Sequence, residues 1–97
     1  MDKAEEVVEA LLQKISGIPE KKSKTVLVGE ALAKMEDDLI LEVFHLIIEK
    51  SRERIPRYQE GLSCITDIPE MVRYLGNARL SVIYTLSRER DYEDVTR

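Results

Sequence analysis

The most apolar stretch of the chain is DLILEVFHLIIE, residues 38–49, and the rest of the architecture depends on it. At 100° per residue, its aliphatic side chains and Phe44 cover more than half of the circumference of a helix. A helix this apolar needs neighbours on two sides, so both halves of the chain must pack against it. We therefore expect a central helix over about 38–54, with Phe44 and its flanking aliphatic residues as the hub of the core.

Five further helices are predicted by apolar residues that recur at i, i+3, i+4 and i+7, and by the residues that interrupt this spacing. The interruptions are Gly17 with Pro19, the acidic run 36–38, Pro56, and Gly76 with Asn77. The predicted helices span about 3–16, 22–35, 56–65, 68–75 and 78–90. The fold class is therefore all-α, a compact five- to six-helix bundle or a short helical-hairpin array, in a single domain over 1–97.

The sequence also predicts local features such as helix ends, helix caps and a close contact between helices. Gly17 is the expected left-handed cap of the first helix, and Gly29 fits a site where a neighbouring helix approaches closely. Asp67 and Glu70 form a predicted capping box. The helix over 78–90 is defined by Leu80, Val82, Ile83 and Leu86. The acidic run 91–94 resembles another helix start with one turn of chain after it, so we expect a fragment of a longer protein or a frayed helix end.

One internal echo is present, because Ser51-Arg52-Glu53-Arg54 recurs as Ser87-Arg88-Glu89-Arg90, 36 residues later. Phe44 then aligns with Leu80, and Ile47 with Ile83. This offset is typical of one helical hairpin in tetratricopeptide or HEAT repeats. The signature tryptophan, glycine and proline patterns of those families are absent, so the echo indicates a possible helical repeat without identifying a family.

Composition favours a folded cytoplasmic protein. Hydrophobic residues make up 43% of the chain and charged residues 35%, which is enough apolar material to form a core. The single cysteine, Cys64, excludes an intramolecular disulfide, and no secretory leader pattern opens the chain. No apolar run approaches the roughly 20 residues that a bilayer requires, so we expect no membrane association.

Glu42, His45 and Glu49 form the candidate metal site of the sequence. They fall on one face of the central helix, and the Glu-x-x-His spacing lets a carboxylate and an imidazole share a metal ion. The alternative is that these residues belong to the polar stripe of that helix and simply face solvent. Because His45 is the only histidine in the chain, a second Glu-x-x-His would have to come from another copy, and we assign no metal.

No catalytic or cofactor site is predicted. A nucleophilic Cys64 would need His45 from a different helix, and free cysteine more often packs in the core. The four glycines are scattered singly, so there is no phosphate-binding loop. The acidic runs 36–38 and 91–94 are better explained as helix caps than as cation sites.

The basic residues are divided between the two halves of the chain. All seven lysines lie within residues 1–50, whereas all eight arginines and all four tyrosines lie within 51–97. Arginine and tyrosine are enriched at interface hot spots, because both bury large contact areas and make directional hydrogen bonds. The alternative is a solvated rim in which cations complement helix C-termini. The candidate partner-binding residues are Arg52, Arg54, Arg57, Tyr58, Arg73, Tyr74, Arg88, Arg90 and Tyr92.

These observations favour a helical protein-interaction or regulatory module without catalysis, which meets a protein partner or another copy through its C-terminal half. The first alternative is binding of single-stranded RNA or DNA by the same arginines and tyrosines. A formal charge of −4 and a pI of about 5.1 disfavour it, because the field of the whole protein repels polyanions. The second alternative is a metal-binding helical protein that uses Glu42, His45 and Glu49.

Overall fold

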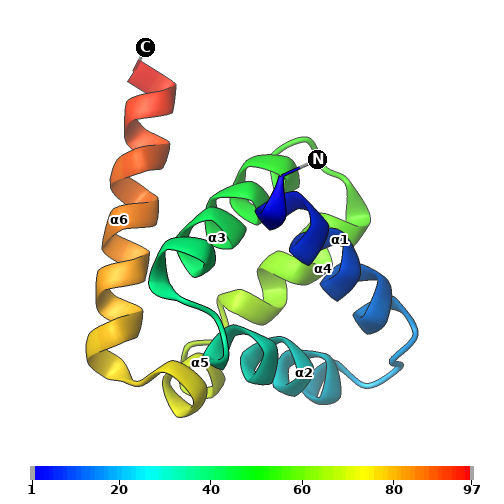
Figure 1. Ribbon diagram of the computed structural model, residues 1–97. Helices are drawn as coiled ribbons and strands as arrows, with labels where there is room; N and C mark the ends of the chain where they lie inside the picture. Colours follow the sequence, from blue (N-terminus) through cyan, green and yellow to red (C-terminus); the bar gives the residue numbers. More distant parts are fainter. Residues whose placement is uncertain (1, 97) are drawn as a thin grey trace.

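The structure is a computed structural model that describes the backbone of residues 2–96 and the side chains of residues 2–90. Within these residues it contains six helices and no strand (Figure 1). The helices are α1 (Lys3–Ser16), α2 (Lys21–Ala33), α3 (Asp37–Ser51), α4 (Pro56–Ile65), α5 (Ile68–Leu75) and α6 (Asn77–Thr96). The predicted all-α bundle is confirmed, and the first five helices begin and end within three residues of their predicted bounds.

Helix α3 is the centre of the bundle, and α1, α4 and α6 all pack against it (Figure 1). Ile40, Val43 and Phe44 on this helix have no exposed surface. The ring of Phe44 lies 5.4 Å from the ring of Tyr84 on α6, measured between centroids. The predicted hub is therefore confirmed, and it is covered by helices from both halves of the chain.

Helix α3 ends at Ser51, three residues before its predicted end, and the reason is Pro56. The residue before a proline is restricted to extended conformations, and Ile55 accordingly has φ −80° and ψ 115°. The chain must leave the helix before it reaches this extended residue. Arg54 makes the turn with φ 60°, the left-handed region that non-glycine residues rarely occupy.

The predicted helix caps are partly confirmed. Asp67 caps α5, because its Oδ1 accepts the backbone N–H of Glu70 at 3.4 Å. Glu70 does not complete the capping box, since the N–H of Asp67 donates to the carbonyl of Cys64 instead. The expected left-handed conformation of Gly17 is wrong: its φ is −86°, and its N–H closes a right-handed turn onto the carbonyl of Lys14.

The close approach expected at Gly29 is confirmed. A Cβ atom placed there would lie 2.3 Å from the ring of Tyr74 on α5. Glycine therefore allows α5 to pack directly against α2, and this contact holds Tyr74 in a half-buried position.

Helix α6 is longer than predicted, because it continues through the acidic run 91–94 to Thr96 without the expected second start. Its inner face packs on α3 and α5 through Leu80 and Ile83. Its C-terminal end extends past the other helices (Figure 1).

The two serines of the internal echo are both buried but differ in their hydrogen bonds, which yields a paired prediction. The Ser51 hydroxyl donates to the carbonyl of Ile48 at 2.8 Å, whereas the Ser87 hydroxyl has no partner in the structure. A buried polar group without a partner destabilises a fold by about 1–3 kcal/mol. Ser87→Ala should therefore raise the free energy of unfolding by about 1 kcal/mol, and Ser51→Ala should lower it by about 0.5 kcal/mol. Urea unfolding of both variants checks the opposite signs, and equal signs would contradict this account.

Candidate interaction surface

Some of the basic residues of both halves make ion pairs between helices of the molecule. Arg57 on α4 pairs with Glu9 on α1 at 2.5 Å, and Arg79 on α6 pairs with Asp37 on α3 at 2.5 Å. Arg90 on α6 pairs with Glu42 on α3, and in the opposite sense Lys24 on α2 pairs with Glu60 on α4 at 2.8 Å. In each of these four pairs, one residue lies within residues 1–50 and the other within residues 51–97. Two of the arginines predicted to meet a partner, Arg57 and Arg90, therefore connect helices of the bundle, as does Arg79, which was not predicted.

Glu9 is the centre of a cluster that joins α1 to α4. One carboxylate oxygen accepts the Tyr58 hydroxyl at 2.6 Å, and the other accepts the Arg57 guanidinium. Arg57 also lies over the Tyr58 ring, 5.1 Å from its centroid. The hydrogen bonds from Tyr58 and Arg57 lower the pKa of Glu9, while burial and the bond to Glu9 raise the pKa of Tyr58 to about 12. Because its ring is buried, Tyr58 is not part of an outward-facing surface.

Tyr58→Phe should lower the free energy of unfolding at pH 7 by about 1–2 kcal/mol, since it removes a hydrogen bond to a half-exposed carboxylate. The pKa of Glu9 is lower in the folded state than its usual 4.5, so this carboxylate stabilises the fold above that pH and less so below it. The difference between wild type and variant should therefore shrink as the pH falls below about 4.5. Urea titrations at pH 7 and pH 3 test this, and a difference that is the same at both pH values would contradict it.

At alkaline pH, the raised pKa of Tyr58 makes the free energy of unfolding fall as the pH rises. A phenol that ionises near pH 10 in the unfolded chain and near 12 in the folded chain stabilises the fold below pH 10. Its contribution is lost as the pH rises from 10 to 12. Tyr84, whose hydroxyl donates to the carbonyl of Ile65, has a pKa raised to about 12 by burial and acts in the same direction.

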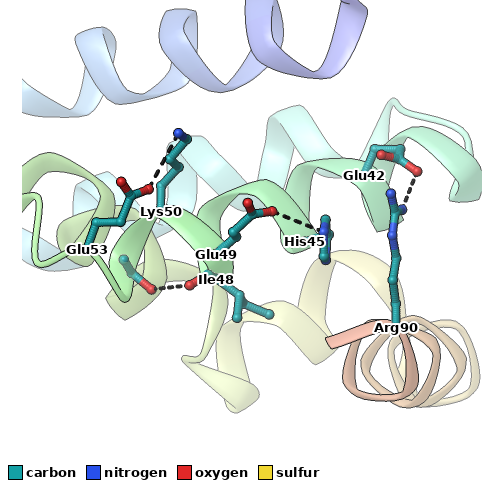
Figure 2. A network of polar contacts seen from close by, with 8 residues as sticks. Glu42, His45, Ile48, Glu49, Lys50, Glu53 and Arg90 are labelled. Carbon is teal, nitrogen blue, oxygen red and sulfur yellow. Dashed lines mark hydrogen bonds and ion pairs between the residues drawn. The ribbon is translucent and has the colours of Figure 1, made fainter. Parts of the chain in front are cut away.

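The polar face of α3 is occupied by pairs of residues (Figure 2). Arg90 reaches across from α6 to Glu42, and His45 Nε2 lies 3.2 Å from a carboxylate oxygen of Glu49. The expectation that this stripe simply faces solvent is wrong for His45, whose side chain is only 11% exposed. Among the residues that the structure describes, no three His, Cys, Asp or Glu side chains come together as a metal site.

The other predicted residues are spread over several elements. Arg52 and Arg54 lie exposed at the turn after α3, Arg73 lies exposed on α5 beside Glu70, and Arg88 lies exposed on α6. Tyr74 packs against Gly29. Tyr92 lies outside the residues whose side chains are described. The structure therefore does not gather the predicted arginines and tyrosines into one patch.

Three apolar side chains on the surface were not predicted. Val82 and Leu86 are 55% and 43% exposed on the outer face of α6, and Ile68 is 48% exposed at the start of α5. Val82 and Leu86, two of the four apolar residues that define this helix in the sequence, are therefore not part of the core. Helix α6 buries Leu80, Ile83 and Ser87, which follow one another at spacings of three and four. Val82 and Leu86 are themselves four residues apart and form a ridge on the flank of the helix, about 110° around its axis from the buried set.

Cys64 lies in the core and its exposed surface is 1%. Burial raises the pKa of its thiol, which keeps the thiolate, the reactive form, scarce. This placement agrees with the packing role expected from the sequence.

Comparisons with protein-family models, curated proteins and solved structures find no match to this chain. Within the part of the chain that the structure describes, no helix has both the length and the apolarity to cross a bilayer.

Proposed function

We propose that this chain is a protein-interaction or regulatory module without catalysis, and that its contact surface is the outer face of α6. The observation that supports the proposal is the exposed ridge of Val82 and Leu86. Exposed apolar side chains that lie next to each other on a helix are typical of contact sites. The ridge replaces the scattered arginines and tyrosines as the centre of the proposed surface.

The partner that this ridge fits is an amphipathic helix of another protein. Two half-exposed side chains supply only a small part of the roughly 800 Å² per partner that a stable complex buries. The contact we propose is therefore weak and transient, and it is too small to hold two copies together by itself. Helices use apolar residues at i and i+4 to pack on such a ridge.

The charge of α6 defines the partner further. Residues 77–90 contain three arginines and one acid, Glu89, although the whole chain has a formal charge of −4. Arg79 and Arg90 are paired with Asp37 and Glu42 on α3, so the exposed Arg88 is the cation that acidic residues beside the apolar stripe of a partner helix would complement. The acidic run 91–94 then limits the complementary region to the part of α6 before it.

A synthetic helical peptide with leucines at i and i+4, flanked by glutamates, tests the proposal in an amide chemical-shift titration. We expect saturable shifts confined to residues 79–90. Leu86→Asp should weaken binding about fivefold or more, because a central apolar contact contributes over ~1 kcal/mol. Gln13→Asp introduces the same charge on exposed α1 and should leave binding unchanged. A peptide with lysines in place of glutamates should bind less tightly.

Two results would overturn the proposal. The first is an absence of saturable shifts, or shifts spread evenly over the other helices. The second is a chain that dimerises through this ridge, which light scattering would show as twice the 11.2 kDa mass, lost in Leu86→Asp. In that case the occupant is a second copy and not another protein.

A further inference from the structure

Gly76 is the single residue between α5 and α6, and its backbone conformation is open to glycine alone. It has φ 84° and ψ 154°, a region that L-residues avoid because of their Cβ atom. A Cβ built at this position would meet nothing within 4 Å. The need for glycine therefore comes entirely from the backbone torsion and not from packing.

The backbone hydrogen bonds at Gly76 are already those of a continuous helix. Its N–H donates to the carbonyl of Val72 at 2.8 Å, and its carbonyl accepts the N–H of Leu80 at 3.0 Å. At the break, the first three N–H groups of α6 and the last three carbonyls of α5 lack these helical partners. A change of torsion at this one joint would pair them and fuse the two helices from Ile68 to Thr96.

The docking of α6 on the rest of the bundle is built from contacts that a second copy can supply equally well. The inner face buries Leu80, Ile83 and Ser87, and the Ser87 hydroxyl has no hydrogen-bond partner there. The polar contacts include Arg79 to Asp37 and to the Met35 carbonyl, Arg90 to Glu42 on α3, and the Tyr84 hydroxyl to the Ile65 carbonyl on α4. None of them depends on which chain α6 belongs to.

We infer that Gly76 is a hinge through which two copies of this chain exchange α6. In the exchanged dimer, α5 and α6 form one helix, and α6 of each copy lies on α3 of the other. Fusion adds the three backbone hydrogen bonds at the joint, and the contacts of α6 are kept. Glycine at position 76 favours the monomer, in which the joint is bent, because glycine accepts this backbone conformation and is a poor helix former. In the exchanged dimer, α3 is thus covered by α6 of a second copy. This contact does not involve the partner that we propose for the outer face of α6.

Gly76→Ala tests the inference, because alanine strains the bent joint, favours the continuous helix and clashes with nothing. We expect the dimer dissociation constant, measured by sedimentation or light scattering, to fall at least tenfold relative to wild type. Gly17→Ala is the matched control, since Gly17 has φ −86° and a Cβ there makes only ordinary contact. It should leave the mass unchanged.

A second substitution separates exchange from association through the outer ridge. In the Gly76→Ala background, Leu86→Asp should leave the dimer intact, because Leu86 is 43% exposed and is not part of the buried set of α6. Amides 77–79 should gain protection from hydrogen exchange. If Gly76→Ala loses its helical circular dichroism, Asn77→Ala serves instead: it favours the continuous helix without straining Gly76, and should strengthen the dimer at least twofold. A monomer in whichever variant folds, or a dimer dissolved by Leu86→Asp, would overturn the inference.

Discussion

Phe44→Ala should lower the free energy of unfolding by about 3–5 kcal/mol, the largest effect we expect from any single substitution in this chain. The ring is fully buried at the point where α3 meets α6, and it packs against the ring of Tyr84. Truncation leaves a cavity that helices from both halves of the chain cannot close without moving. Since domains of this size are stable by about 5–15 kcal/mol, the variant should be near its folding limit at 37 °C.

Urea unfolding followed by circular dichroism at 222 nm measures this loss. Leu86→Ala is the matched control, because it also shortens an apolar side chain but on the exposed face of α6, and it should change stability by less than about 0.5 kcal/mol. A loss below ~1.5 kcal/mol for Phe44→Ala would show that the core does not depend on this residue.

The helices were predictable because their signals are local. Apolar spacing identifies a helix, and residues such as Pro56 and Asp67 mark its ends within the same few positions. Gly17 was not predictable in the same way, because a right-handed turn and a left-handed cap both accept glycine. The early end of α3 at Ser51 follows from the restriction that Pro56 places on Ile55, which the apolar pattern of α3 does not contain.

The contact surface was less predictable, since it depends on which residues meet across the bundle. Arginine is a residue type that is common at interfaces, which is why Arg57 and Arg90 were candidates. Once the helices pack, however, these two arginines pair with Glu9 and Glu42 of the same chain. The sequence contained a sign of this pairing, because an acidic first half and an arginine-bearing second half are complementary. Only the packing shows that the attraction is satisfied within one chain.

Helix α6 shows why an apolar pattern alone does not identify the buried face of a helix. Leu80, Val82, Ile83 and Leu86 fit a broad apolar stripe, and both Ile83 and Val82 are plausible core residues. The buried set is completed by Ser87, a polar residue that a hydrophobicity pattern leaves out. The exposed ridge of Val82 and Leu86, which supports the proposed function, consists of the two apolar residues of the pattern that lie outside the buried set.

Arg79→Met should lower the free energy of unfolding by about 2–3 kcal/mol, which corresponds to a melting temperature lower by roughly 10 °C or more. The guanidinium donates to Asp37 Oδ1 and to the carbonyl of Met35, each at 2.5 Å, and so ties α6 to the junction between α2 and α3. Methionine retains the aliphatic stem and removes the polar contacts, which leaves the Met35 carbonyl without this donor.

A double-mutant cycle with Asp37→Asn separates the two contacts of Arg79. The carboxylate is mostly exposed, so its share should be below about 1 kcal/mol and should decrease in 0.5 M salt. The carbonyl contact is part-buried and should supply the rest without a salt dependence. Arg88→Met, on the exposed side of the same helix, is the control and should lie within ±0.5 kcal/mol of wild type. If Arg79→Met matches that control, the two contacts of Arg79 do not contribute to holding α6 on the bundle.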